Sequence, residues 1–154
     1  MEDIWKREEI KAQSIAMISS FKELVGRDLI ATSDDHDQDT YALFHAPFAL
    51  LSHGLEDDPI LNYGNQTALT LWEMDFAHFT RMPSRLTAEP MVRDERQRLM
   101  EKAARQGYID DYSGIRISAS GTRFRITNVI LWNVTNAKGT RLGQAAVFDQ
   151  WDVV

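Results

Sequence analysis

The chain has 154 residues, a formal net charge of −6 and 44% hydrophobic residues, which suits one domain with a core of its own. It contains no cysteine, and this excludes disulfides, cysteine-ligated metals, thiol catalysis and flavin–cysteinyl adducts. The N-terminus has no signal-peptide pattern, and no apolar run reaches the length of about 20 residues that a membrane span needs. A cytoplasmic protein that binds no membrane is therefore expected. The net negative charge disfavours binding to nucleic acid.

Residues 3–25 predict one amphipathic helix, which with its cap occupies residues 1–32. Ile10, Met17 and Phe21 recur at helical spacing, and Gly26 suits the end of the helix. The apolar stripe must be buried somewhere. Packing on the sheet of the same chain is the favoured interpretation, and pairing with the same helix of a second chain is the alternative.

Residues 33–42 are the most polar stretch, and they predict a solvated linker that could cap the next helix. Asp35, Asp37 and Asp39 have the spacing of the first ligands of a calcium-binding EF-hand loop. That template requires glycine where Thr40 stands and glutamate where Ala46 stands. A calcium site is therefore disfavoured.

The remaining residues, 43–154, predict one α+β domain. The expected elements are strands over 48–53 and 60–63, a helix opened by Asn65, a short helical piece over 84–88, a helix over 91–105, and strands over 108–118, 122–134 and 141–151. The periodicity changes from helix to strand at Gly107. This order predicts an antiparallel sheet with helices on one face.

The order of these elements and several short motifs resemble the PAS fold and, more narrowly, the MEKHLA family. The motifs are Ile60-Leu61-Asn62-Tyr63-Gly64-Asn65 with Ala68 and Leu71-Trp72, Gly121 before Phe124, Ile130-Leu131-Trp132-Asn133-Val134, Gly139 before Gly143, and Ala146-Val147-Phe148-Asp149-Gln150-Trp151. The resemblance covers roughly residues 43–152. It implies a sensory or interaction module, and it implies neither a reaction nor an agreed ligand.

Strand alternation suggests which side chains would contact a ligand. In the strand over 122–134, Asn128 falls in the same register as Phe124 and Trp132, which places an amide on the apolar face. A buried amide needs partners, so Asn128 is expected either to contact a ligand or to make a structural hydrogen bond. Gln150 is a second polar candidate if its face is the inner one. The aromatic candidates for the cavity wall are Trp72, Phe124, Trp132 and Phe148.

The sequence requires no cofactor. Flavin is disfavoured, although asparagine and glutamine on adjacent strands could meet a ring edge. Haem is disfavoured as well, because the helix over 91–105 has no histidine and His78 is the only well-placed axial candidate, with a structural role favoured. The four histidines show no two-ligand helical spacing, so no metal site is expected.

An arginine cluster lies between residues 81 and 105. Arg85, Arg93 and Arg96 are candidates for contacting an anion or a second subunit, while exposed salt bridges along the helix are the favoured explanation. These features together predict a non-catalytic sensory, ligand-binding or protein-interaction module, acting as a homodimer through its first helix and sheet and binding a small apolar ligand or a protein partner.

Two alternatives remain open. The first is a cone-shaped α+β enzyme, similar to ketosteroid isomerases, that acts on an apolar small molecule. Such an enzyme needs a carboxylate or a histidine facing an apolar pocket, and the long strand over 122–134 has no acidic residue in its apolar register. The second is an interaction scaffold whose cavity is filled by its own aromatic side chains, including Trp72, Phe124 and Trp132.

Overall fold

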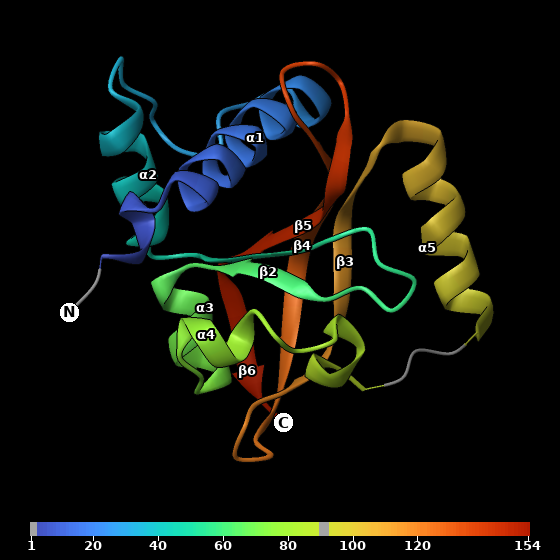
Figure 1. Cartoon of the computed structure of the whole chain (residues 1–154). Helices are drawn as coiled ribbons and strands as arrows, with labels where there is room; N and C mark the ends of the chain where they lie inside the picture. Colours follow the sequence, from blue (N-terminus) through green and yellow to red (C-terminus); the bar gives the residue numbers. More distant parts are fainter. Residues whose placement is uncertain (1–2, 90–92) are drawn as a thin grey trace.

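The structure is a computed structural model that describes residues 3–89 and 93–154, with the side chains of Arg93 and Arg96 outside the described part. Its centre is one antiparallel sheet in the order β2-β1-β5-β4-β3, and β6 pairs with β4 beyond the end of β5. Helices cover both faces of this sheet (Figure 1). The elements are η1 Ile4–Lys6, α1 Glu8–Val25, α2 His36–Phe44, β1 Ala49–His53, β2 Leu61–Gly64, α3 Gln66–Trp72, α4 Phe76–Phe79, η2 Ser84–Thr87, α5 Arg93–Gln106, β3 Tyr108–Ile117, β4 Arg123–Thr135, β5 Arg141–Phe148 and β6 Gln150–Val153.

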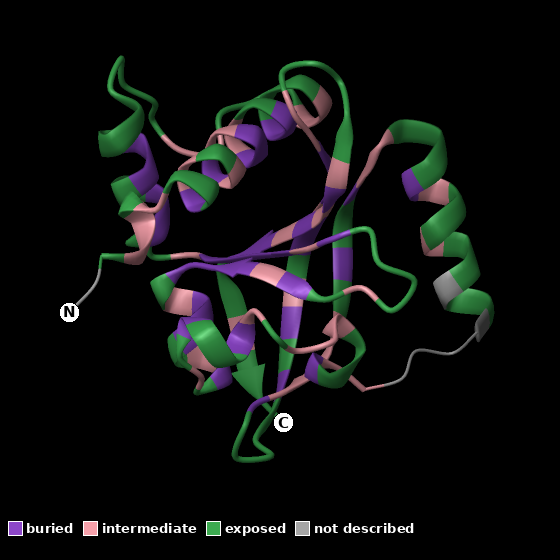
Figure 2. Ribbon diagram, in the orientation of Figure 1, coloured by how far each residue is buried: buried purple, intermediate pink, exposed green. Residues whose placement is uncertain are grey.

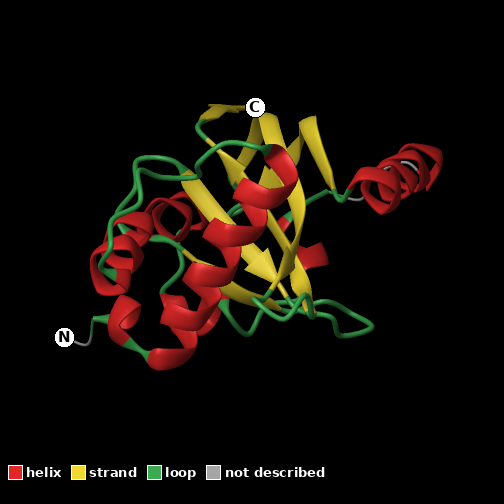
Figure 3. Ribbon diagram, turned by 90° about the horizontal axis from the view of Figure 1, so that it is seen from above, coloured by secondary structure: helices red, strands yellow, loops and turns green. Residues whose placement is uncertain are grey.

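The first helix packs on the sheet of its own chain, as favoured from its apolar stripe. Extended backbone at Arg7 separates the turn η1 from α1, and Gly26 ends α1 at a φ of 86°. Phe21 and Ser20 meet the indole of Trp132 on β4, through a ring contact of 4.9 Å and a hydrogen bond of 3.0 Å from Nε1 to Oγ. Viewed from above, α1 runs across the sheet (Figure 3).

The polar segment is partly helical, which corrects the expectation of a solvated linker. Asp35 starts α2 because its carboxylate accepts hydrogen bonds from the backbone N–H groups of Asp37 and Gln38. Asp39 is buried and accepts hydrogen bonds from the backbone and hydroxyl of Ser33. The aspartates therefore shape the start of a helix that packs against α1.

The two faces of the sheet are covered by different helices. The expected arrangement of helices on one face holds for α3, α4, η2 and α5, while α1 adds a helix on the opposite face. Trp72 of α3 contacts Phe124 of β4 and Phe148 of β5 at ring distances of 5.2 and 6.1 Å. Figure 2 shows the buried residues concentrated along the strands and on the sides of α1 and α3 that face them.

The simple alternation predicted for residues 122–134 fails at Asn128. Asn128 has a φ of 53°, and both Thr127 and Asn128 direct their side chains to the same Gln150 amide oxygen, at 3.4 and 2.9 Å. Two successive side chains on one face shift the alternation of the residues that follow. Ile126 and Leu131 consequently face the helices α3 and α5, whereas Trp132 faces α1.

Tyr63 carries a buried hydroxyl without a hydrogen-bond partner among the described residues. The hydroxyl of the neighbouring Ser14 donates instead to the carbonyl of Ile10, at 2.7 Å. Burial raises the pKa of Tyr63 above its ordinary value, and the Ser14 hydroxyl opposes this shift only in part. The hydroxyl must therefore stay protonated in the folded protein at a pH where an unfolded chain would ionise it.

Replacing Tyr63 by phenylalanine is expected to keep or raise stability at neutral pH, by up to about 1 kcal/mol, because the lost hydroxyl has no partner. At alkaline pH the stability of the variant relative to wild type increases further. The raised pKa stabilises the fold below the unfolded tyrosine pKa of about 10, and this contribution is lost as the pH rises further. Urea unfolding at about pH 8 and about pH 11 measures both effects. A variant that is less stable than wild type at alkaline pH would contradict the prediction.

Candidate ligand-binding site

A cavity of about 440 Å³ lies between the sheet and the helical elements α5 and η2. Its sheet side is formed by apolar residues of adjacent strands, which include Leu51, Ile126, Leu131 and Ala146. Trp72 closes one side, and Leu99, Met100 and Ala103 of α5 form the cover. A volume in the range of about 300–1,000 Å³ with an apolar lining is typical of a site for a small molecule.

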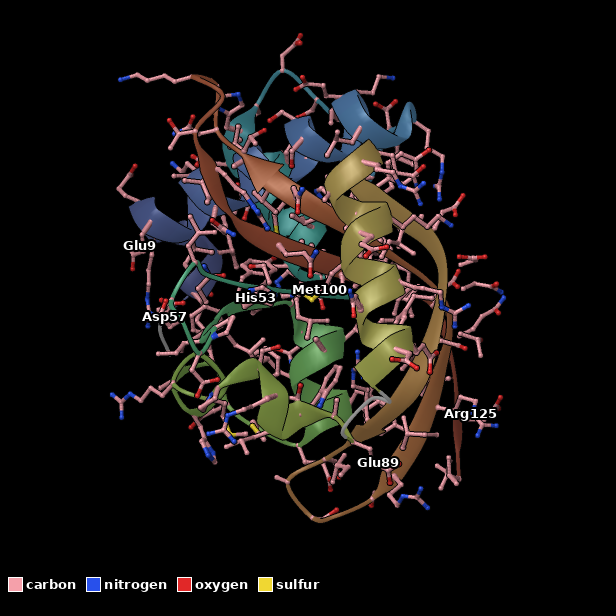
Figure 4. All side chains as sticks on the ribbon, turned by 90° about the vertical axis from the view of Figure 1, so that its right-hand side faces the viewer. Glu9, His53, Asp57, Glu89, Met100 and Arg125 are labelled. Carbon is pink, nitrogen blue, oxygen red and sulfur yellow. The ribbon has the colours of Figure 1, made fainter. Side chains whose placement is uncertain are left out.

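The cover is only partly packed. Ala103 is buried against the sheet side, whereas Met100, the next apolar residue one turn earlier, is 62% exposed although it also lines the cavity. Figure 4, which views the molecule from the side of α5, shows Met100 at one edge of this helix and His53 farther out on the same side. An exposed methionine at the cavity mouth leaves apolar surface that a ligand or a partner can cover.

Several polar side chains also line the cavity, and most of the charged ones are paired. Arg85 of η2 contacts Asp58 at 3.1 Å, and Glu89 contacts Arg123. The Arg123 guanidinium lowers the pKa of Glu89 by donating a hydrogen bond to its carboxylate. A general base that works near neutral pH needs the opposite shift, so this pairing weakens the interpretation as an isomerase-like enzyme.

Two of the four aromatic candidates line the cavity. Trp72 and Phe148 form part of its wall, and the Trp72 indole is fixed by a hydrogen bond of 3.3 Å to the Thr87 carbonyl. Phe124 packs behind Trp72 in the core. Trp132 lies on the opposite face of the sheet under α1, so the expectation that it shares a face with Phe124 is wrong.

The two amide candidates do not reach the cavity. Asn128 and Gln150 are exposed and hydrogen-bonded to each other at 2.9 Å on the outer face of the sheet. The expectation of an amide on the apolar face is wrong, because the left-handed backbone at Asn128 turns its side chain outward. These two amides therefore give no support to a flavin ring edge inside the cavity.

The remaining candidates are scattered. His78 is exposed on α4, where its backbone N–H is bound by the Asp75 carboxylate. Arg85 lines the cavity but is paired with Asp58. Arg93 and Arg96 belong to α5, and their side chains lie outside the described residues.

Sequence reasoning missed several polar residues of the lining, among them four on the inner face of the sheet. His53 and Gln144 are paired across β1 and β5, and Tyr112 and Arg116 share the inner face of β3. The alternation of the last strand groups Gln144 with Ala146, Phe148 and Gln150 on one face, so the signal for Gln144 was present. That face points inward as far as Phe148, and the break at Asp149 between β5 and β6 turns Gln150 to the other side.

The described residues offer no group of three histidine, aspartate or glutamate side chains arranged to hold a metal ion. Within the same residues, no helix is long and apolar enough to cross a bilayer.

Solved structures similar to this chain are PAS and light-oxygen-voltage domains. A PAS domain from Colwellia psychrerythraea is 12% identical with a TM-score of 0.61, over 76% of this chain and 94% of that one. A PAS domain of a two-component sensor histidine kinase is 17% identical with a TM-score of 0.54, over 74% and 91%. An RNA-binding light-oxygen-voltage receptor is 20% identical with a TM-score of 0.62, over 79% of this chain but only 36% of the receptor.

No curated protein matches the sequence. The MEKHLA domain, by contrast, matches residues 11–153, which include most of α1 as well as the whole PAS-like sheet. The resemblance inferred from the motifs is thus confirmed and extends further toward the N-terminus than expected, and the chain belongs to the MEKHLA domain family.

Proposed function

We propose that this chain is a non-catalytic sensory domain that binds a small, mostly apolar molecule in the cavity between the sheet and α5. The observation that carries the proposal is the cavity itself, about 440 Å³ in volume and lined by apolar side chains from five strands. The PAS domain of a sensor histidine kinase among the similar structures agrees with a signalling role. Fold similarity alone would not establish it.

In this proposal the ligand acts by changing the position of α5. Leu99 and Met100 contact the cavity, while the other side of the helix is exposed and polar. A ligand that packs against these two side chains would bind better to one position of α5 than to another, which is the requirement for a conformational response. A protein partner would then read the change on the exposed surface.

Homodimerisation through α1 and the sheet remains part of the proposal. The apolar stripe of α1 is buried within the chain, so a second copy would have to use the outward side of the helix. There Ala12, Ile15 and Ser19 form a groove together with Asn136, Ala137 and Gly139 of the turn between β4 and β5. A groove of this kind fits an additional helix or strand from another chain better than the buried stripe does.

Filling the cavity is the direct test of ligand binding. Ala146 lies on the sheet side between Leu51 and Leu131, so Ala146→Leu is expected to weaken binding of the neutral dye Nile red by about tenfold or more, because the new side chain occupies ligand space. Dye fluorescence titration measures the affinity. The matched control is Ala104→Leu on the exposed side of α5, which should bind the dye like wild type. Equal affinity in all three proteins would refute the cavity as the binding site.

A further inference from the structure

Arg116 lines the cavity without an acidic partner. It lies on β3 opposite Phe124, and its guanidinium is 5.4 Å from the ring centre of Tyr112. Nη2 donates to the Tyr112 hydroxyl at 3.3 Å, and Nη1 to the Ile115 carbonyl at 3.3 Å. In the described part of the chain, no carboxylate forms an ion pair with this guanidinium.

The other charged side chains of the lining differ from Arg116. Arg85 and Glu89 each have a partner of opposite charge, and Asp57 is exposed on the loop between β1 and β2. Arg116 is partly buried, so water solvates its charge less completely than that of a surface arginine. The lining therefore contains one cationic side chain, among those described, whose charge no protein group balances.

The local backbone holds this guanidinium in place. Gly114 lies between Tyr112 and Arg116 on the same face of β3, and a Cβ atom there would stand 2.5 Å from the Tyr112 hydroxyl and 3.4 Å from Arg116 Nη1. The absence of a side chain at Gly114 lets the phenol and the guanidinium lie side by side along the strand. An arginine has five N–H donors, and those left free by these contacts can bind both oxygens of a carboxylate.

We propose that the cavity ligand is an apolar molecule with a single carboxylate, and that Arg116 binds this carboxylate. The apolar part of the ligand would pack on Trp72, Ile126 and Leu131. One unbalanced cation matches one negative charge, whereas a phosphate monoester carries nearly two and would call for more cationic groups. The inference rests on the proposed function, because it assigns chemistry to the same cavity.

The test compares carboxylates with their uncharged amides. Decanoate and decanamide form one pair, and cinnamate and cinnamamide form a second; isothermal titration calorimetry gives each affinity. Wild type is expected to bind at least one acid about tenfold to a hundredfold more tightly than its amide. In Arg116→Gln this preference should disappear while amide binding is retained, and Arg116→Lys, which keeps the charge without the planar fork, should give an intermediate value.

Arg125→Gln is the matched control. Arg125 is exposed on the next strand and points away from the cavity side on which Met100 and His53 lie (Figure 4). This variant makes the same change in net charge, so it should keep the preference of wild type for the acid. Loss of the preference in both glutamine variants would indicate a general charge effect and would overturn the role of Arg116. Circular dichroism verifies that each variant is folded.

The outcomes separate this inference from the proposed function. Equal binding of acid and amide by wild type would overturn the carboxylate ligand and leave the cavity as a binding site. Binding of Nile red without binding of any of the four acids and amides would likewise overturn the carboxylate ligand and leave the cavity as a binding site. If neither the dye nor any of the four molecules bound, both the carboxylate and the cavity as a small-molecule site would be refuted.

Discussion

Replacing Asn65 by alanine is expected to destabilise the fold by about 3–5 kcal/mol, which is a large share of the stability of a domain of this size. Asn65 has 0% of its surface exposed and precedes α3. Its side-chain oxygen accepts hydrogen bonds from the backbone N–H groups of Leu50 and Ala68, both at 3.1 Å. One residue thus caps a helix and holds a strand at the same time.

The amide nitrogen of Asn65 adds two further contacts. It donates to the carbonyls of Leu43 and Phe48, at 3.2 and 2.9 Å, so the side chain joins the end of α2 and the start of β1 to α3. Alanine would leave four backbone groups, three buried and one partly buried, without these partners. Each unpaired buried group costs on the order of 1–3 kcal/mol, and relaxation reduces the sum.

Chemical unfolding of Asn65→Ala and of two other variants measures this effect. Asn65→Asp keeps the acceptor oxygen but loses both donations and should also be strongly destabilised. Asn62→Ala, on β2 just before Asn65, removes the acceptor of one partly buried hydrogen bond from the Ser52 hydroxyl and should cost only about 1 kcal/mol. A loss below about 1 kcal/mol for Asn65→Ala would show that water replaces the contacts and that the side chain is not a structural hub.

Replacing Trp132 by alanine is expected to cost about 3–5 kcal/mol and to loosen α1 from the sheet. The indole has 0% exposed surface, lies edge-on to Phe21 at 4.9 Å and donates its N–H to Ser20. Its removal leaves a large cavity under the C-terminal half of α1 and takes away the N–H that the Ser20 hydroxyl accepts, although this hydroxyl still donates to the Ala16 carbonyl at 2.7 Å. Because α1 also buries Ile10 and Met17, its release would expose a continuous apolar surface.

Hydrogen exchange combined with urea unfolding tests this prediction, since exchange reports where protection is lost. Protection should fall most in α1 and in β4 next to it. Trp151→Ala is the matched control: Trp151 lies on β6, is only partly buried and contacts Phe148 at 5.8 Å, so its loss should cost clearly less. Equal losses for both tryptophans, with α1 still protected, would refute the role assigned to Trp132.

Local signals in the sequence predicted most of the secondary structure. The helix after Asn65, the ends of α1 at Gly26 and of α5 at Gly107, and the long strands all depend on caps, glycines and alternation within a few residues. The missed helix α2 was also encoded locally, because Asp35 is an N-cap residue. The polar composition of residues 33–42 favours a linker, and it outweighs this capping signal in a prediction from sequence.

The inward face of each strand was harder to predict. A period of two assigns every side chain of a strand from a single reference residue, so one irregular residue reverses all the assignments beyond it. Asn128 is that residue in β4, and the break at Asp149 between β5 and β6 has the same effect on Gln150. The predicted ligand contacts failed at these positions for this reason.

The sequence alone determined that this is a cysteine-free α+β domain with an amphipathic first helix, and its motifs indicated the family. Those properties follow from composition and from interactions between residues close in the chain. Only the tertiary structure decided that α1 covers the outer face, that Trp132 belongs to that face, and that Gln144 and Arg116 line the cavity. Such contacts join residues far apart in the chain, and their geometry depends on strand register and on the left-handed backbone at Asn128, which no local pattern specifies.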